Sequence, residues 1–476
     1  MDSKWIETLA RKLGEANVIP ADRIPARFTE EPRGRFFARP ALLVRPGSTQ
    51  EVAATIRQCR AAGVSIVARG GGTGLVGGAS VHSSVHCERD GVLLSLDRMH
   101  RVCAVDPDAA VITLEAGVTL SRAQTAAFEY QLSVPLSLAS GGSATVGGIL
   151  ATNAGGNTTI RHGNARRMLL GLEAVLADGR VLDLMSTLRK DNTGYALGQL
   201  FVGSEGTLAI ITRAALALVP GARQRMTVWC ALTSPEAAVR LLRECRAHLG
   251  ETLSAFELIP RLALDLVLDY LPGAEDPLAR PHPWYVLLDA DSAISGDWLE
   301  PACTRLFERA LETGLIANAV FAQSGSKADA LWRLREAISP AQKQIGASIK
   351  HDISVPIASI PAMIDSTLAT VEREIPGIRP CVFGHVGDGN LHFNLSRPAD
   401  WSDDAFMARE TPINQIVFDA VDRLGGSIAA EHGIGRLRRD ELARRANPVK
   451  LEALQRIKRA LDPDNLLNPG KVVVAE

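Results

Sequence analysis

Six of the ten residues from Arg69 to Gly78 are glycines, and this density constrains the fold more than any other feature of the chain. Glycine has no Cβ atom, so it adopts positive φ angles and lets the backbone approach another group closely. A strand-like run, Val64–Ala68, leads directly into the segment. Successive backbone N–H groups in such a loop form a concave surface that binds anions. The segment therefore predicts a loop that binds an anionic ligand, such as a pyrophosphate.

Two further glycine-dense segments follow in the first half of the chain. Residues Pro135–Gly156 combine glycines with serine and threonine hydroxyls, a mixture suited to close contact with a large planar ligand. Residues Leu200–Ile211 place a Gly-Ser-Glu-Gly turn before an apolar strand. Each segment alone is also typical of an ordinary turn in an α+β domain. Their occurrence together favours a cofactor-binding domain.

One pattern in the first glycine segment suggests a different kind of site, a dinucleotide-binding fold. Residues Gly72–Gly77 match the Gly-x-Gly-x-x-Gly pattern of dinucleotide-binding proteins, and the acidic Asp97 follows a strand-like run. That pattern requires a helix that begins at the glycines. Residues 78–90 carry no apolar stripe at helical spacing, so we expect a loop there. The expected helix lies earlier, between a capping box at Ser48–Glu51 and Gly63.

Two histidines lie in a segment predicted to be a β-hairpin. Apolar runs flank Gly387–Asn390, a group typical of a tight turn. A turn centred there places His385 opposite His392, with Cβ atoms about 5 Å apart. Glu431 and His432 end a strand-like run just before another glycine turn. Two imidazoles and a carboxylate suit a metal site; the alternative is a histidine pair that caps a hairpin beside an unrelated acidic residue.

Composition excludes several classes of function. The chain has 476 residues, enough for two or three domains, and a net charge of −1. No basic excess indicates nucleic-acid or lipid binding, and no apolar run approaches the ~20 residues of a membrane span. The start lacks the layout of a signal peptide. Seven scattered cysteines without a Cys-x-x-Cys pair suit a reducing compartment, so a cytoplasmic location is expected.

Taken together, these segments resemble a known family, the FAD-dependent 2-hydroxyacid dehydrogenases of the vanillyl-alcohol oxidase/p-cresol methylhydroxylase (PCMH) type. The resemblance covers nearly the whole chain and rests on RGGGTGLVGG, GGSATVGGILATNAGG, RKDNTGYALGQLFVGSEGTLAIIT, FGHVGDGNLHFN, AAEHGIG and LDPDNLLNPGK. The RKDNTGY stretch and the histidine segments are most similar to the D-2-hydroxyglutarate dehydrogenase branch. D-Lactate and glycolate dehydrogenases are near relatives of that branch.

The resemblance implies an α+β fold in three parts. Residues 1–220 are expected to form a two-subdomain FAD-binding domain, residues 221–440 a substrate (cap) domain with an antiparallel sheet, and residues 441–476 a segment that returns to the FAD domain. Thr73 stands in the loop where many relatives tether FAD through a histidine, so non-covalent FAD is expected. The expected FAD-binding residues are Arg69, Gly70, Gly71, Gly72, Thr73, Gly74, Leu75, Ser140, Gly141, Thr145, Gly147, Gly148, Asn153, Gly155, Glu205, Gly206, Ile211 and Asn468.

The resemblance also assigns roles at the reaction centre. His385, His392 and Glu431 are expected to hold a divalent metal, zinc or another ion such as manganese, because ligand type alone rarely fixes the identity of a metal. His432 is the expected general base. The residues expected to bind the substrate carboxylates are Arg335, Ser339, Lys350 and Asn394, with Ser339 in a position where that branch has threonine.

The implied reaction is hydride transfer from C2 of a D-2-hydroxy acid to flavin N5. D-2-Hydroxyglutarate, giving 2-oxoglutarate, is the expected substrate. D-Lactate, glycolate or another monoacid is the alternative within enzymes, and a non-catalytic flavin-binding subunit is the alternative outside them. The expected partners are the small-molecule acid and a separate electron acceptor, for which an electron-transfer flavoprotein is one candidate. A homodimer is an open question, and neither nucleic acid nor a membrane span is expected.

Overall fold

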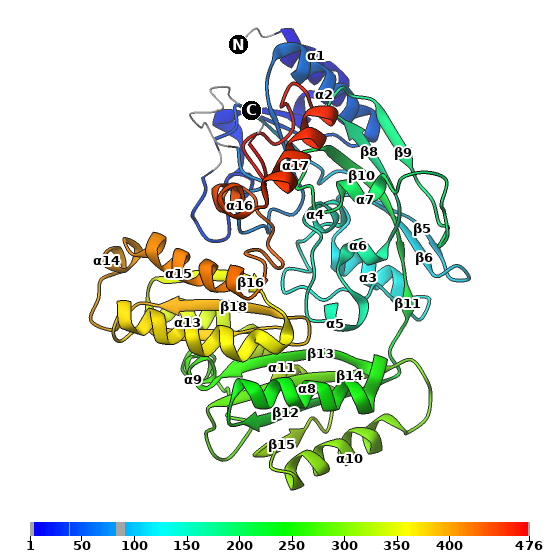
Figure 1. The fold of residues 1–476 in the computed structure, drawn as a ribbon. Helices are drawn as coiled ribbons and strands as arrows, with labels where there is room; N and C mark the ends of the chain where they lie inside the picture. Colours follow the sequence, from blue (N-terminus) through cyan, green and yellow to red (C-terminus); the bar gives the residue numbers. More distant parts are fainter. Residues whose placement is uncertain (1–3, 38, 82–90, 475–476) are drawn as a thin grey trace. The chain divides into compact units, whose positions relative to one another are not determined.

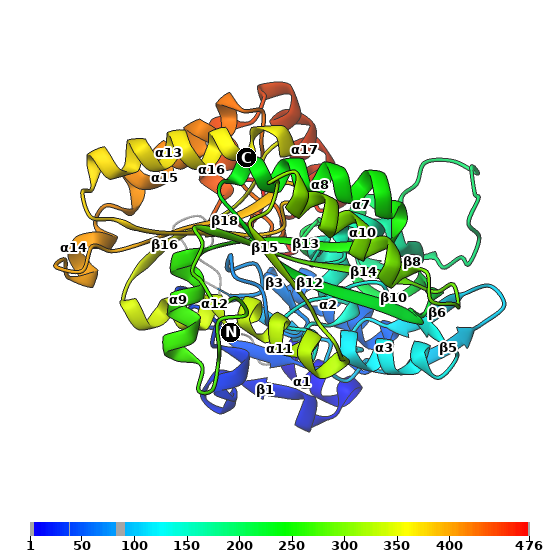
Figure 2. The same cartoon turned by 90° about the horizontal axis from the view of Figure 1, so that it is seen from below.

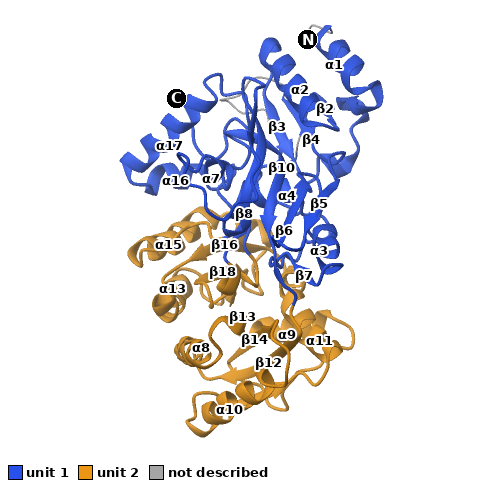
Figure 3. Ribbon diagram, turned by 90° about the vertical axis from the view of Figure 1, so that its right-hand side faces the viewer, with its two compact units in different colours: residues 1–155, 163–221, 431–476 blue, residues 156–162, 222–430 orange. Residues whose placement is uncertain are grey.

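The computed structural model describes residues 4–37, 39–81 and 91–474, and the chain forms two compact units (Figure 3). Unit 1 contains residues 1–155, 163–221 and 431–476, and unit 2 contains residues 156–162 and 222–430. Each unit combines helices with antiparallel strands, so the α+β fold class is confirmed. The predicted divisions after residues 220 and 440 stay predictions.

The first sheet of unit 1 carries the first glycine segment at the end of one strand. Its strands lie in the order β1 (Val18–Pro20), β2 (Leu42–Val44), β4 (Val92–Ser95) and β3 (Ile66–Arg69). Helix α2 (Thr49–Ala62) joins β2 to β3 as predicted: the Ser48 side chain accepts a hydrogen bond from the Glu51 N–H, and Gly63 ends the helix at a φ of 64°. Helix α1 (Lys4–Leu13) precedes this sheet.

The second sheet of unit 1 is antiparallel, with five strands in the order β5-β6-β10-β8-β9. The strands are β5 (Val102–Asp106), β6 (Val111–Glu115), β10 (Ala209–Ala217), β8 (Leu169–Leu176) and β9 (Val181–Leu184). The helices are α3 (Leu120–Phe128), α4 (Val146–Thr152), α6 (Ala165–Met168), α7 (Gly198–Phe201), α16 (Arg439–Arg445) and α17 (Pro448–Leu461), and β7 (Leu132–Ser133) pairs with β11 (Val219–Pro220).

The C-terminal segment, which includes the red helix α17 in Figure 1, belongs to unit 1, and buried polar contacts hold it there. Lys458 on α17 is 2% exposed, and its Nζ donates to the carbonyl oxygens of Thr207 at 2.8 Å and Leu467 at 2.9 Å. Leu467 also forms a parallel bridge with Ile66 of β3. A buried ammonium needs such partners, so Lys458 fixes the tail against the third glycine segment.

A four-stranded antiparallel sheet forms one half of unit 2. Its order is β13 (Leu253–Pro260), β14 (Trp284–Ser292), β12 (Gln224–Leu232) and β15 (Asn318–Phe321). Apolar side chains of α8 (Pro235–Leu249) and α10 (Leu299–Glu312) pack on one face. Apolar side chains of α9 (Arg261–Tyr270), α11 (Gly325–Glu336) and α12 (Ile338–Gln342) pack on the other face. Figure 2 shows the ribbons of these helices around the sheet.

A three-stranded antiparallel sheet forms the other half, in the order β16 (Ser348–Ser354), β18 (Asn390–Ser396) and β17 (Arg379–Phe383). Helices α13 (Ile360–Glu374) and α15 (Glu410–Arg423) cover its apolar face. A bridge between Leu258 of β13 and Gly384 connects the two sheets. The short helices α5 (Thr159–His162) and α14 (Asp403–Met407) complete the unit.

The structure tests two predictions about local structure, the loop after the first glycine segment and the strand before Glu431. No helix begins at the first glycine segment, because residues 70–81 are turns and bends, so the dinucleotide-binding alternative was rightly set aside; residues 82–90 of the predicted loop lie outside the described residues. The run before Glu431 is not a strand, as Ser427 makes a single bridge to Ser354 and the Ala430 N–H bonds the Asp352 carbonyl instead. Among the described residues, no helix is long and apolar enough to cross a membrane.

Candidate active site

All three glycine segments line one cavity in unit 1, with a volume of about 950 Å³. This volume lies at the upper end of the range for small-molecule and cofactor sites. The first segment contributes Arg69–Val76, the second contributes residues from Leu138 to Gly155, and the third contributes Ser204–Gly206. The prediction that these segments act together is therefore met by the geometry of the unit.

Close backbone packing explains why the first segment needs glycine. A Cβ atom on Gly71 would lie 1.8 Å from the Ser143 carbonyl oxygen, and one on Gly70 would lie 2.3 Å from Thr145 Oγ1. Gly72 has a φ of 70°, in the left-handed region. Thr145 lines the cavity, and its buried Oγ1 has no hydrogen-bond partner within the described part of the chain. A buried hydroxyl needs a hydrogen-bond partner, and a polar planar cofactor such as FAD would supply one in this cavity.

The predicted FAD-binding residues divide into two groups. Asn468 lies outside the lining, and its Nδ2 donates to the carbonyl oxygens of Gly78 at 2.9 Å and Glu205 at 2.6 Å, so it holds the cavity wall. Asn153 ends α4 and accepts from the Arg166 N–H, while Gly141 lies in a turn. The predicted residues that line the cavity are Arg69, Gly70, Gly71, Gly72, Thr73, Gly74, Leu75, Ser140, Thr145, Gly147, Gly148, Gly155, Glu205, Gly206 and Ile211.

Glu205 connects the cavity to the Glu-His-Gly loop. Its two carboxylate oxygens accept hydrogen bonds from the backbone N–H groups of Ile434 at 2.8 Å and Gly435 at 2.9 Å. Glu431 and His432, which precede these residues, also line the cavity. Burial raises the pKa of Glu205 to about 7, in opposition to the two backbone hydrogen bonds. Glu205 therefore anchors the loop that carries the predicted base.

The three-stranded sheet of unit 2 has one polar face, and this face gathers several predicted site residues. Lys350, Asp352 and Ser354 of β16 pair with Asn394, His392 and Asn390 of β18, respectively. Directly paired residues share a face of the sheet. The intervening residues of both strands are buried in the apolar core on the opposite face. Period-two alternation in β16 and β18 thus places a lysine, a histidine, an aspartate and two asparagines together.

The hairpin differs from its prediction. His392 pairs with Phe383, so His385 is not opposite it in the ladder. The reason is that Gly384 leaves the hairpin to bond Leu258 in both directions, at 2.9 and 3.1 Å. The His385 carbonyl then accepts from the N–H groups of Asp388, Gly389 and Asn390, which closes a longer turn. The two imidazoles nevertheless lie together, with ring centroids 5.3 Å apart.

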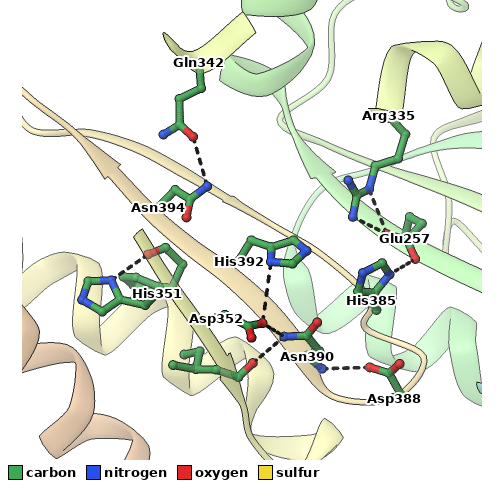
Figure 4. A network of polar contacts seen from close by, with 12 residues as sticks. Glu257, Arg335, Gln342, His351, Asp352, His385, Asp388, Asn390, His392 and Asn394 are labelled. Atoms are coloured by element: carbon green, nitrogen blue, oxygen red, sulfur yellow. Dashed lines mark hydrogen bonds and ion pairs between the residues drawn. The ribbon is translucent and has the colours of Figure 1, made fainter. Parts of the chain in front are cut away.

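A buried carboxylate that was not predicted, Glu257 on β13, contacts two site residues at once (Figure 4). One of its oxygens, Oε1, lies 2.5 Å from Nδ1 of His385. The other, Oε2, accepts from Nε of Arg335 at 2.8 Å and lies 2.8 Å from its Nη2. Burial alone would raise the pKa of Glu257, but the facing His385 and Arg335 overcome this effect and hold the pKa at about 2. The carboxylate is therefore ionised at neutral pH.

The second histidine also faces a carboxylate. Oδ1 of Asp352 lies 3.9 Å from Nδ1 of His392 and accepts a hydrogen bond from Nδ2 of Asn390 at 2.9 Å. Metal-binding histidines commonly have a carboxylate against the ring nitrogen that does not bind the metal. Glu257 lies within hydrogen-bond distance of His385, whereas the 3.9 Å contact of Asp352 with His392 is longer than a hydrogen bond. The two histidines and their carboxylates therefore fit a divalent metal.

The predicted substrate-binding residues occupy different environments. Arg335 lies in the last turn of α11 and is 8% exposed, and its guanidinium carbon lies 4.7 Å from the centroid of the Phe383 ring. Asn394 is buried, and its Nδ2 donates to Gln342 at 3.0 Å. Lys350 is partly exposed on the polar face, whereas Ser339 is exposed on α12. The geometry places Lys350 and Asn394 opposite each other in one ladder.

The charges of two cations, Lys350 and Arg335, act on one buried thiol, that of Cys381. Burial raises the pKa of the Cys381 thiol to about 12, and the charges of Lys350 and Arg335 oppose that rise. Cys381 pairs with Asn394 across β17 and β18. The charges of Arg335 on α11 and Lys350 on β16 thus both act on the strand position next to Asn394.

Sequence reasoning missed Glu257, Asp352, Asn390 and Gln342. Two of them leave a recognisable signal. Glu257 is the one charged residue in a buried strand, Leu253–Pro260, and a charge in such a strand needs a partner. Asp352 alternates with Lys350 and Ser354 and so shares their face. Asn390 and Gln342 show no comparable signal.

Comparisons with known proteins identify the family and the fold. A family model described as "FAD linked oxidases, C-terminal domain" matches residues 222–472, and one described as "FAD binding domain" matches residues 40–185. p-Cresol methylhydroxylase, solved with substrate bound, shares the fold with a TM-score of 0.74 at 18% identity, over 99% of this chain and 97% of its own.

Three curated relatives match nearly the whole chain. D-2-Hydroxyglutarate dehydrogenase of Xanthomonas citri pv. viticola is 36% identical over 97% of this chain and 96% of its own. The mitochondrial D-2-hydroxyglutarate dehydrogenase of Arabidopsis thaliana is 34% identical over 99% and 82%. A putative mitochondrial D-lactate dehydrogenase of Schizosaccharomyces pombe is 34% identical over 92% and 83%.

Proposed function

Because this chain belongs to the FAD-linked oxidase family, within the group of FAD-dependent D-2-hydroxyacid dehydrogenases, we propose that its substrate is D-2-hydroxyglutarate and that a divalent metal assists the reaction. Oxidation of the alcohol gives 2-oxoglutarate. The non-catalytic alternative is set aside, because relatives named as dehydrogenases match along almost the full chain.

The observation that carries the substrate proposal is the concentration of cationic and amide groups around the polar face of unit 2. Arg335, Lys350 and Asn394 offer more donors than a single carboxylate needs. A planar guanidinium binds a carboxylate through two parallel hydrogen bonds, and lysine supplies a compact charge. Such a set suits a diacid whose second carboxylate lies several ångströms from the reacting carbon.

The proposed metal ligands are His385 and His392, with Glu431 as the third ligand that the sequence predicts. Zinc is the proposed ion, with manganese as the alternative. A bound metal supplies Lewis acidity, which lowers the pKa of a substrate hydroxyl. The Glu257 carboxylate orients the His385 ring through Nδ1, and Nδ1 of His392 faces Asp352 at 3.9 Å.

FAD supplies the hydride acceptor and is proposed to bind non-covalently, because Thr73 stands in the loop where many relatives have a histidine. The glycine backbone and Thr145 bind and orient the cofactor. His432, which lines the same cavity, is the proposed general base that takes the proton from the C2 hydroxyl oxygen.

A second candidate is oxidation of a monoacid, because one relative is named as a putative D-lactate dehydrogenase. The test is anaerobic bleaching of the purified flavoprotein by D-2-hydroxyglutarate, D-malate, D-lactate and glycolate, with metal analysis of the same sample. Preference for D-2-hydroxyglutarate and one metal per chain support the proposal. Preference for D-lactate contradicts the substrate assignment, and absence of metal contradicts the metal assignment.

Electron acceptor, assembly and compartment remain proposals. We propose a separate acceptor such as an electron-transfer flavoprotein, which reoxidation of the bleached flavin by each candidate tests. A homodimer is tested by light scattering. The cytoplasm is proposed from the scattered cysteines, and the relatives from A. thaliana and S. pombe are named as mitochondrial.

A further inference from the structure

We propose that Glu257 is a positioning residue that fixes the metal-binding and substrate-binding halves of the site through one carboxylate. This inference rests on the proposed function and deepens it. The side chain is fully buried on β13 and contacts His385 with one oxygen and Arg335 with the other. Figure 4 shows the carboxylate between the two residues.

The contact with His385 determines which ring nitrogen carries hydrogen. The other oxygen of Glu257 faces the guanidinium of Arg335, and a carboxylate paired with arginine has acceptor atoms only, so Nδ1 of His385 is the donor in the 2.5 Å contact. In a neutral imidazole the other nitrogen, Nε2, then carries the lone pair. Glu257 thereby holds the tautomer and the ring orientation that a metal ligand needs.

The contact with Arg335 leaves one edge of the guanidinium for another anion. Nε and Nη2 both lie 2.8 Å from Oε2 of Glu257. A guanidinium carries five N–H donors in a plane, so the edge formed by Nη1 and the second Nη2 hydrogen remains for a carboxylate. The Phe383 ring, 4.7 Å from the guanidinium carbon, supports the plane from one side. Glu257 therefore sets the direction in which Arg335 presents its donors.

A matched control lies in the same sheet. Asp289 on β14 is 8% exposed and accepts from Arg225, Thr227 and Trp332. Glu257 pairs with Leu287, two residues from Asp289, so both carboxylates lie on the same face of the sheet. Asp289 is thus a buried carboxylate that, like Glu257, is paired with an arginine, but its contacts with Arg225, Thr227 and Trp332 lie apart from the two histidines of the proposed centre.

The experiment measures zinc affinity on the full-length flavoprotein after removal of metal by a chelator. Wild type, Glu257→Gln, Glu257→Asp and Asp289→Asn are titrated with Zn²⁺ against a fluorescent competing chelator, and flavin content and melting temperature are recorded for each. Outer partners of metal ligands typically change metal affinity about 10- to 100-fold. We expect that loss for Glu257→Gln, a smaller loss for Glu257→Asp, and a change below about 3-fold for Asp289→Asn.

A second readout tests the link to Arg335. A double-mutant cycle measures kcat/KM for D-2-hydroxyglutarate. Arg335→Lys should have a smaller effect in the Glu257→Gln background than in wild type, because the Arg335 guanidinium is no longer oriented there by the Glu257 carboxylate. Equal effects in both backgrounds overturn the shared role.

The outcomes separate this inference from the proposed function. Wild-type zinc binding that Glu257→Gln and Glu257→Asp leave unchanged overturns the positioning role and leaves the metal proposal intact. Equal losses in Asp289→Asn and Glu257→Gln also overturn it, since they indicate a general effect of removing a buried charge. A wild-type protein that binds no zinc overturns the proposed metal centre itself. If Glu257→Gln does not fold, the comparison of Glu257→Asp with Asp289→Asn decides.

Discussion

Replacement of Arg335 by lysine should separate diacid from monoacid substrates. The structure determines the choice of variant: alanine would leave the fully buried Glu257 without its ion pair to Arg335. Breaking a buried ion pair in this way costs about 3–5 kcal/mol of stability. Lysine keeps a positive charge beside Glu257 but has no planar edge for a second carboxylate.

The magnitude follows from the donors that are lost. The free edge of Arg335 can give a substrate carboxylate two charge-assisted hydrogen bonds, and lysine engaged with Glu257 retains at most one well-directed donor. Loss of one such bond in a desolvated site costs about 2 kcal/mol, or about 30-fold in kcat/KM. The expected decrease is about 30-fold for D-2-hydroxyglutarate and below about 3-fold for D-lactate.

Steady-state kinetics with an artificial electron acceptor measures both substrates on one preparation. Arg225→Lys is the matched control, because Arg225 forms the same kind of two-nitrogen contact with Asp289, at 2.9 and 2.7 Å, away from the polar face. This control should change neither kcat/KM by more than about 2-fold. An equal decrease for both acids in Arg335→Lys would refute the reasoning, because Arg335 would then hold the carboxylate that both substrates share.

The remaining predictions concern the metal, the base, the flavin and pH. His392→Ala should lose metal and turnover together while it keeps the flavin, as measured by metal analysis and the visible spectrum. His432→Ala should keep the metal and lose rate; loss of metal would make His432 a ligand. Acid precipitation should release all yellow colour, since Thr73 offers no histidine tether, and colour left in the pellet would contradict non-covalent binding. Burial raises the pKa of Glu205 from 4.5 to about 7, so its contribution to stability is present below pH 4.5 and is lost as pH rises through 7. In urea unfolding of the apoprotein, the free energy of unfolding of wild type should fall by about 3 kcal/mol relative to that of Glu205→Gln between pH 4.5 and 8. Unfolding free energies that change with pH in parallel for the two proteins would contradict this.

Local signals predicted the parts of the fold that local forces determine. Helix α2 begins after Ser48 and ends at Gly63 as expected, because both residues act through hydrogen bonds within a few residues. The glycine segments likewise predicted a ligand-binding loop, because few residues other than glycine adopt positive φ angles or fit such close backbone contacts.

The errors arose where a distant strand decides the local structure. The hairpin was expected to turn at Gly387–Asn390, yet Gly384 leaves the ladder because Leu258 offers it two backbone hydrogen bonds. The turn residues cannot predict this pairing, because Leu258 lies on β13, far earlier in the sequence. The strand expected before Glu431 is reduced to one bridge, between Ser427 and Ser354 of β16, and one further hydrogen bond, from the Ala430 N–H to Asp352.

The same limit applies to the site, and it has a consequence for mutagenesis. Alternation in β16 and β18 could have indicated that Lys350 and Asp352 share a face, but it could not show that Glu257 reaches both His385 and Arg335. One ionised carboxylate between two site residues couples them, because a change at either alters the hydrogen bonding of the other. Single substitutions at His385 or Arg335 therefore report on metal and substrate together, and a thermodynamic cycle through Glu257 is needed to separate the two.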